Sequence, residues 1–201
     1  MRLGVFGGTF DPPHVGHLLV ATDVLEQLSL DRILLIPNFV QPLKGKAEAS
    51  AKHRLEMVRL LAGDSSYLQV ESMEVDREGV SYTVETLERL AQGYPGARLF
   101  FVIGPDALET LSAWKEPARI QELATLAVVT RELLRVRVGG GHIDDASAIP
   151  AGAITVATRT IDISSSEIRE RVRRGKPIRG FVTPEVELYI SEHGLYRQAG
   201  E

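Results

Sequence analysis

The stretch that decides the fold reads Arg2-Leu3-Gly4-Val5-Phe6-Gly7-Gly8-Thr9-Phe10-Asp11-Pro12-Pro13-His14-Val15-Gly16-His17. It begins with an apolar run of strand length and passes through a glycine-containing turn. A segment with helical spacing then begins at Val15 and extends to Leu28. Strand, turn and helix in this order predict the first unit of an α/β protein.

The same alternation continues along the chain. Apolar runs of strand length cover Leu3 to Phe6, Ile33 to Ile36, Leu68 to Val70, Leu99 to Ile103, Leu126 to Val129 and Ile154 to Val156. Helical stretches cover Val15 to Leu28, Ala51 to Ala62, Thr83 to Ala91, Ala107 to Leu111, Ile120 to Leu123, Ser165 to Arg174 and Pro184 to His193. Near-continuous apolar strands are typical of a parallel sheet buried on both faces. We therefore predict fold class α/β: a Rossmann-like, doubly wound parallel sheet in one domain over residues 1–201, with C-terminal helices and a surface loop from Val138 to Ala153.

Composition excludes several kinds of protein. Of the 201 residues, 44% are hydrophobic and 25% charged, which is typical of a soluble globular protein. The absence of cysteine excludes disulfides, thiolate nucleophiles and Cys-ligated metals. No apolar stretch approaches the ~20 residues of a membrane-spanning helix. With a formal net charge of −4, we expect a cytoplasmic protein with neither membrane nor nucleic-acid partners.

Gly7, Gly8, His14 and His17 predict an anion site. The glycines allow close approach of the backbone to a ligand and permit a positive φ. The helix that begins here offers free N–H groups and the positive end of its dipole. The i, i+3 spacing places both imidazoles on one side of this helix start. A tight turn without function and a zinc-binding pair are the alternatives, although zinc helices more often use i, i+4 spacing with a third ligand.

A second helix start follows the last predicted strand, at Ile163-Ser164-Ser165-Ser166-Glu167-Ile168-Arg169. A serine N-cap and a carboxylate in the first turn predict a well-capped helix. Arg169 lies one turn inside, where it can meet an anion held by the helix start. Together, the two helix starts could hold a polyphosphate. For Arg171, Arg173 and Arg174 we expect a solvated face.

Both segments resemble the motifs of a known family. Gly8 to His17 resembles the signature of the nucleotidyltransferase superfamily that shares the His-x-Gly-His motif with class I aminoacyl-tRNA synthetases, in the form found in bacterial nicotinate-nucleotide adenylyltransferases. Ile163 to Arg169 resembles that family's Ile-Ser-Ser-Thr-x-Ile-Arg motif, with Ser166 at the threonine position. The resemblance spans the chain from Gly7 to Tyr196. It implies an enzyme of NAD biosynthesis that joins ATP and nicotinate mononucleotide, with Mg²⁺ held mainly by the ATP phosphates and no protein metal ligands.

The resemblance also implies a role for individual residues. Catalytic roles fall to His14, His17, Lys44 and Arg169. ATP binding falls to Gly7, Gly8, Thr9, Phe10, His14, His17, Gly104, Asp106, Arg131, Ile163, Ser164, Ser165, Ser166 and Arg169. Binding of the mononucleotide falls to Lys44, Thr83, Trp114 and Lys115. The loop from Pro37 to Lys44 departs from the family pattern at Gln41 and Leu43, which leaves its role open.

Other readings of the sequence stay open. The chain could be a phosphopantetheine adenylyltransferase, a class with a similar Gly-Thr-Phe-Asp start. It could also be a nicotinamide mononucleotide adenylyltransferase, since backbone groups can bind either an amide or a carboxylate on the pyridine ring. A non-catalytic nucleotide- or RNA-binding module built on the basic run from Arg169 to Arg179 is a further alternative. A homo-oligomer is compatible with the sequence.

Overall fold

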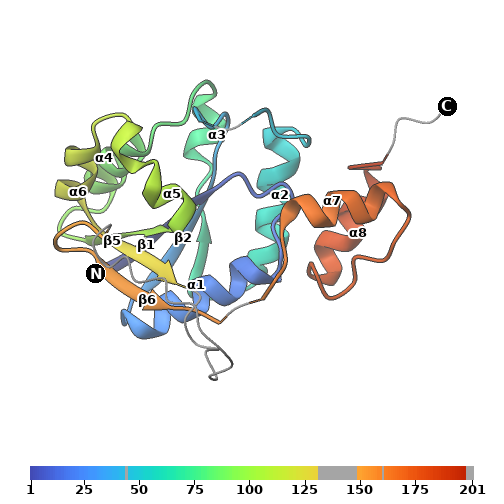
Figure 1. Cartoon of the computed structure of the whole chain (residues 1–201), viewed down its shortest axis with the longest axis horizontal. Helices are drawn as coiled ribbons and strands as arrows, with labels where there is room; N and C mark the ends of the chain where they lie inside the picture. The colour runs from blue at the N-terminus through green and yellow to red at the C-terminus, as the bar shows by residue number, and fades with distance from the viewer. Residues whose placement is uncertain (44, 131–148, 160, 198–201) are drawn as a thin grey trace, which may run out of the picture. The chain divides into compact units, whose positions relative to one another are not determined.

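The computed structural model describes residues 1–43, 45–130, 149–159 and 161–197 (Figure 1). The strands are β1 (Arg2–Gly8), β2 (Arg32–Pro37), β3 (Leu68–Val70), β4 (Arg98–Ile103), β5 (Ala124–Thr130) and β6 (Ile154–Ala157). The α-helices are α1 (Val15–Gln27), α2 (Ala51–Ala62), α3 (Met73–Arg77), α4 (Thr83–Gly93), α5 (Pro105–Glu109), α6 (Pro117–Leu123), α7 (Ser165–Arg173) and α8 (Pro184–Glu192). A short 3₁₀ helix covers Leu111–Ala113. Most of the loop expected from Val138 to Ala153 lies outside the described residues.

The six strands form one sheet in the order β3-β2-β1-β4-β5-β6. β1 pairs with β4, β4 with β5 and β5 with β6, all parallel. The burial of every residue of β4 after Arg98 fits its continuous apolar sequence. This is the strand order of a Rossmann-like, doubly wound sheet, so the predicted fold class is confirmed. In such sheets ligands bind at the carboxyl ends of the strands, where residues 9–14 join β1 to α1.

The helices that differ most from the sequence prediction are α3, α5 and α6, the last of which begins at Pro117 rather than Ile120. α5 begins at Pro105 rather than Ala107, because proline is favoured in the first turn of a helix and Gly104 serves as the N-cap. α3 was not predicted from the pattern. At five residues it is too short to show a helical period.

The chain forms two compact units, and each is described by itself. Unit 1 comprises Met1–Phe6, Val20–Ile33 and Tyr82–Thr160, and unit 2 comprises Gly7–Leu19, Leu34–Ser81 and Ile161–Glu201. In unit 1, α4 packs on α6, and both α5 and α6 contact β5. That the chain is one domain stays a prediction.

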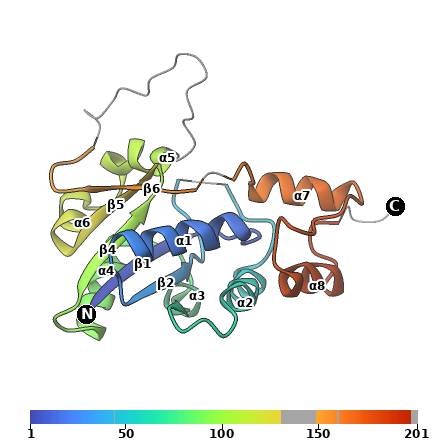
Figure 2. The same cartoon turned by 90° about the horizontal axis from the view of Figure 1, so that it is seen from below.

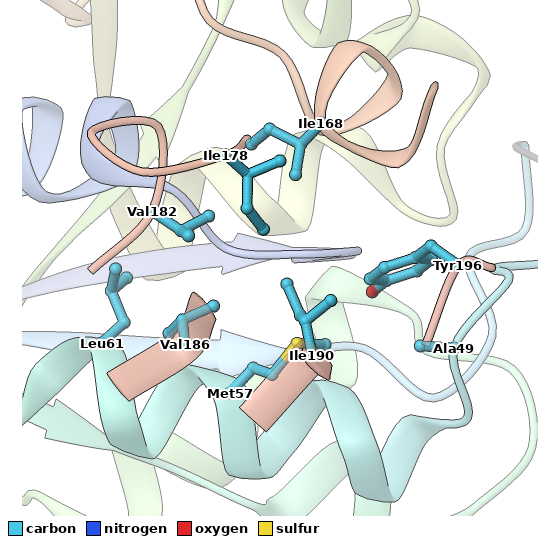
Figure 3. Packing of buried hydrophobic residues seen from close by; sticks show 9 residues of the cluster. All are labelled: Ala49, Met57, Leu61, Ile168, Ile178, Val182, Val186, Ile190 and Tyr196. Atoms are coloured by element: carbon cyan, nitrogen blue, oxygen red, sulfur yellow. The ribbon is translucent and has the colours of Figure 1, made fainter. Parts of the chain in front are cut away.

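The core of unit 2 joins the C-terminal helices to α2. Its buried members are Ala49, Met57, Leu61, Ile168, Ile178, Val182, Val186, Ile190 and Tyr196. Figure 3 shows Met57 and Leu61 of α2 beside Val186 and Ile190 of α8. Ile168, on α7, is fully buried. This packing fixes the helix that carries Arg169.

Within the ranges described, no helix has the length and apolar character that crossing a membrane requires.

Candidate active site

The rings of His14 and His17 form a close, tilted pair at the start of α1. Their ring centroids are 3.7 Å apart, with the planes inclined at 32°. The backbone N–H of His14 donates to Nδ1 of His17 over 3.1 Å. An imidazole nitrogen that accepts a hydrogen bond carries no proton, so neutral His17 is protonated on Nε2. The predicted pair is therefore brought together, and His17 has a fixed tautomer.

Gly16 explains how the His14 ring can lie so close to α1. A Cβ at position 16 would stand 2.9 Å from Nδ1 of His14, which is closer than real Cβ contacts. That nitrogen is buried, and no described residue forms a hydrogen bond with it. An unsatisfied buried polar atom is costly and is concentrated at functional sites.

The strained backbone of the turn lies at Phe10 rather than at the glycines. Gly7 and Gly8, which permit a positive φ, are absent from the positive-φ residues of the described chain, whereas Phe10 has φ of 50°. The buried ring of Phe10 packs edge-on against His17, with centroids 4.9 Å apart. Gly8 is needed for this packing, because a Cβ there would stand 3.0 Å from the Phe10 ring. Around Gly7 a Cβ would meet open space.

Both imidazoles are neutral near pH 7. Burial lowers the pKa of His14 from 6.5 to about 4. Burial, with the nearby charge of His14 when protonated, also holds the pKa of His17 well below 6.5. In the ligand-free protein these rings therefore act as neutral hydrogen-bonding groups.

The turn after β1 and the start of α7 are in direct contact in unit 2. The Ser165 hydroxyl donates to the carbonyl of Pro12 over 2.8 Å, and Figure 2 shows α7 next to the N-terminal end of α1. Nη1 of Arg169 donates to the carbonyl of Asp11 over 2.8 Å. Its Nη2 donates to the Ser166 hydroxyl over 3.3 Å. The two predicted helix starts thus face one site.

The first turn of α7 is built as its sequence predicts. The Ser164 side chain caps the helix by accepting from the backbone N–H of Glu167 over 3.1 Å. Ile163, just before the cap, packs against the core of unit 2. Ile163 and Ser164 therefore position this helix start.

Asp11 holds the turn to two other parts of unit 2. Its carboxylate accepts from the backbone N–H groups of Glu48 and Ala49 over 2.7 and 3.0 Å. It also accepts from the Tyr196 hydroxyl over 2.8 Å. Sequence reasoning assigned no role to Asp11, since its partners lie 37 or more residues away.

Arg54 is a second residue that sequence reasoning missed. It is 1% exposed and donates to the carbonyls of Thr9, Phe39 and Ala49 over 2.7, 3.0 and 3.3 Å. The sequence did contain a signal for its burial, because helical spacing places Arg54 on the same face of α2 as the apolar residues Met57, Val58 and Leu61, which are all buried. A charged residue in an apolar stripe is buried only with partners.

Thr9 connects the turn to the loop that follows β2. Its hydroxyl donates to Oε1 of Gln41 over 2.9 Å and accepts from the Asn38 side chain over 3.2 Å. Gln41, which departs from the family pattern, thus completes a local hydrogen-bond chain. These contacts place Thr9 in support of the loop.

Three of the residues expected to bind the mononucleotide, Thr83, Trp114 and Lys115, lie in unit 1. Thr83 is the first residue of α4. Nζ of Lys115 lies 2.8 Å from the carboxylate of Glu85 and 4.7 Å from the ring centroid of Tyr82, so Lys115 borders the first turn of α4. Trp114 donates from Nε1 to Thr110 over 3.2 Å and is half-buried.

The other predicted residues are distributed as follows. Gly104 and Asp106 lie at the carboxyl end of β4, in the N-cap and first turn of α5. Lys44 and Arg131 lie outside the described residues.

The solvated face expected for the arginines of α7 is wrong for two of them. The side chain of Arg173 is 30% exposed and is paired with Glu48 and Glu170. Arg171 donates to the carbonyl of Pro177 over 2.9 Å and lies 4.4 Å from the Phe181 ring centroid. Arg174, 63% exposed, fits the prediction.

Among the described residues, no group of three or more His, Cys, Asp or Glu side chains could hold a metal ion. The carboxylate of Asp11, which lies within the turn, accepts from the three donors given above. The site therefore offers donors for an anion.

Fold and site together define the class of cytidylyltransferase-like proteins, whose family model matches residues 5–171. A probable nicotinate-nucleotide adenylyltransferase of Gemmatimonas aurantiaca is 46% identical over 198 residues, covering 98% of this chain and 93% of that protein. The nicotinate-nucleotide adenylyltransferase of Bacillus subtilis is 37% identical over 196 residues, covering 97% of this chain and 98% of that one. The chain belongs to the cytidylyltransferase-like family and, within it, to the nicotinate-nucleotide adenylyltransferases.

Solved structures agree on the fold. Plasmodium falciparum nicotinic acid mononucleotide adenylyltransferase complexed with NaAD aligns with a TM-score of 0.77 at 19% identity and covers 97% of both chains. A putative nicotinate-nucleotide adenylyltransferase of Vibrio parahaemolyticus aligns with a TM-score of 0.68 at 24% identity, covering 98% of this chain and 96% of that one.

Proposed function

We propose that the chain transfers the adenylyl group of ATP to nicotinate mononucleotide, giving nicotinate adenine dinucleotide and pyrophosphate. The observation that carries this proposal is the joining of two anion-binding helix starts: Ser165 and Arg169 of α7 contact the turn that bears His14 and His17. Family membership supports the choice of reaction, since relatives at 37–46% identity carry the name of this activity.

The reaction needs no protein nucleophile. An oxygen of the mononucleotide's phosphate attacks the α-phosphorus of ATP, and the bond from that phosphorus to the bridging oxygen of the β-phosphate breaks. The electron pair leaves with pyrophosphate. A phosphate monoester is already anionic at neutral pH, so the protein's part is alignment of the reactants and stabilisation of charge.

Each half of the unit 2 site has a task in this step. The N–H on Nε2 of His17 can donate to an oxygen of the α-phosphate as charge develops there, with His14 alongside. Arg169, with Ser165 and Ser166 at the start of α7, binds the departing pyrophosphate. Lys44 neutralises phosphate charge. Gly7 and Gly8 admit the nucleotide to the turn.

The resemblance to the family supports roles for further residues, which lie in unit 1. Thr83, Trp114 and Lys115 hold the nicotinate mononucleotide, with the indole plane available to a pyridine ring. Gly104, Asp106 and Arg131 serve the adenylate side.

We expect Mg²⁺ to enter the site together with ATP. When bound, it would neutralise the phosphate charge through phosphate oxygens and its own waters. The described residues supply anion donors around His17 and Arg169, which is consistent with a metal that arrives on the nucleotide.

The test measures pyrophosphate release from ATP and magnesium with nicotinate mononucleotide, nicotinamide mononucleotide and phosphopantetheine as separate acceptors. We expect release with nicotinate mononucleotide to exceed that with the other two. Equal release, or none with the first acceptor, would overturn the proposal. Salt-sensitive RNA binding without pyrophosphate release would favour the non-catalytic alternative.

A cytoplasmic location, the absence of nucleic-acid and membrane partners, and a homo-oligomeric state stay predictions.

A further inference from the structure

Glu48 bridges two arginines of α7. Oε1 of Glu48 accepts from Nε of Arg169 over 2.7 Å, and Oε2 accepts from Nη2 of Arg173. Its side chain is 38% exposed, against 20% for Arg169. Burial raises the pKa of Glu48, but hydrogen bonds from Arg173 and Arg169 outweigh it and lower the pKa below 4.5, so the bridge is charged at neutral pH.

The nitrogens of Arg169 have different kinds of partner. Glu48 takes Nε, the nitrogen nearest the chain. The terminal nitrogens Nη1 and Nη2 meet only neutral acceptors among the described residues, namely the carbonyl of Asp11 and the hydroxyl of Ser166. A phosphate oxygen is a stronger acceptor than either. The terminal edge of the guanidinium is therefore the edge on which a polyphosphate can bind while Glu48 keeps its place.

Glu48 is also anchored at its backbone. Its N–H donates to Oδ2 of Asp11 over 2.7 Å. Since Asp11 accepts from Arg169 through its carbonyl, Asp11, Glu48 and Arg169 form a closed ring of contacts. If Glu48 only competed with ATP for Arg169, its carboxylate would have to move away from the guanidinium when ATP binds. The backbone bond and the bridge to Arg173 both oppose its departure.

We propose that Glu48 is a positioning residue, which holds the Arg169 guanidinium through Nε so that its terminal nitrogens face the polyphosphate, with Arg173 holding the far oxygen of Glu48. The proposal rests on the proposed function in assigning ATP as the source of the polyphosphate.

The test is Glu48→Gln, which keeps the size of the side chain and removes its charge. Removing a negative charge beside two arginines would by itself favour anions, whereas loss of positioning weakens their binding. We expect KM for ATP to rise about tenfold, with KM for nicotinate mononucleotide within about twofold of the parent. A KM for ATP that falls or stays unchanged would show Glu48 to be a competitor or a bystander, and would overturn the proposal.

The matched control is Glu170→Gln. Glu170 pairs with Arg173 and Arg174, whereas the carboxylate paired with Arg169 is that of Glu48. We expect its KM for ATP to match the parent. In an Arg169→Lys background, Glu48→Gln should add no further change in KM, because Glu48 acts through the guanidinium. An added rise there contradicts the proposal.

Direct binding separates this inference from the proposed function. Calorimetric titration with inorganic tripolyphosphate is expected to give about tenfold weaker affinity for Glu48→Gln than for the parent, and no change for Glu170→Gln. If the parent released no pyrophosphate with nicotinate mononucleotide, the function would fail while this titration still decided the role of Glu48. If Glu48→Gln does not fold, Arg173→Gln is the second variant, and we expect it to bind tripolyphosphate more weakly than the parent does. An unchanged affinity in that variant would overturn the proposal.

Discussion

Gly16 sets the distance between the His14 ring and helix α1. We predict that Gly16→Ala lowers kcat at least tenfold, because the new methyl group would displace Nδ1 of His14 from its position 2.9 Å from the Cβ site. Alanine is also the better helix former, by about 1 kcal/mol, so the thermal midpoint should not fall by much. Steady-state kinetics and thermal unfolding on the same preparation provide the measurement. Parental kcat in the alanine variant would show that the ring tolerates displacement.

In the proposed reaction, His17 has the more direct role. Removal of one preorganised donor typically costs about 10²–10³ in rate, and we predict a loss of this size in kcat for His17→Ala with the fold retained. Single-turnover measurement of pyrophosphate release, with circular dichroism to verify folding, tests it. Near-parental turnover would remove His17 from the mechanism.

The depressed pKa of His14 makes stability depend on pH. Between pH 6.5 and about 4, the unfolded chain binds a proton on this residue and the folded chain does not, because the folded pKa is about 4. The free energy of unfolding therefore falls as pH falls through this window, by about 3 kcal/mol in total for His14. His17, the titratable group in contact with it, shifts in the same direction.

Urea unfolding at pH 7.5 and pH 5 measures this effect. We expect a smaller loss of stability between these two pH values in His14→Asn than in the parent, since asparagine does not titrate. Equal losses in the two proteins would mean that His14 is charged in the folded state.

At the scale of elements, α2 stabilises the site through one buried arginine. Arg54→Leu would leave the carbonyls of Thr9, Phe39 and Ala49 without this donor, and we predict a loss of about 3–5 kcal/mol in the free energy of unfolding. Arg59→Leu is the control, because Arg59 is an exposed residue of the same helix and should change stability by at most about 0.5 kcal/mol. Similar losses in both variants in urea titrations would contradict the structural role of Arg54.

Sequence patterns predicted elements better than contacts. α2 and β3 have the bounds that periodicity predicts, because their apolar residues are regularly spaced. The contact of Ser165 with Pro12 could be anticipated only from the expectation that the two helix starts hold the same polyphosphate. The partners of Asp11 and Arg54 could not be predicted, because hydrogen bonds between distant loops leave no periodic signal in the sequence. Glu48 is the clearest case, since it has no special local pattern and meets Arg169 121 residues later in the chain.

At the scale of the whole molecule, unit 2 is assembled from three separate segments of the chain. Tyr196 ties the last of these to the first, through its bond to Asp11. Burial and the Asp11 carboxylate raise the pKa of Tyr196, so its hydroxyl remains a donor throughout the usual pH range.

Tyr196→Phe removes this tie while keeping the ring. We predict a loss of about 2 kcal/mol in the free energy of unfolding, the usual cost for a hydrogen bond to a charged group. Tyr67→Phe, at a tyrosine that is 37% exposed, should leave stability within about 0.5 kcal/mol of the parent. If chemical denaturation gave equal midpoints for the parent and Tyr196→Phe, the bond would have no role in holding the turn.

The position of Tyr196 also has a consequence for protein synthesis. A ribosome makes the histidine-bearing turn first and its tyrosine anchor 185 positions after Asp11. A nascent chain that has emerged only as far as α7 therefore carries every catalytic side chain proposed above, but its turn still lacks one of the three donors to Asp11. Premature termination before residue 196 would yield such a chain. A fusion partner joined just after this residue would lie next to the hydrogen bond between Tyr196 and Asp11.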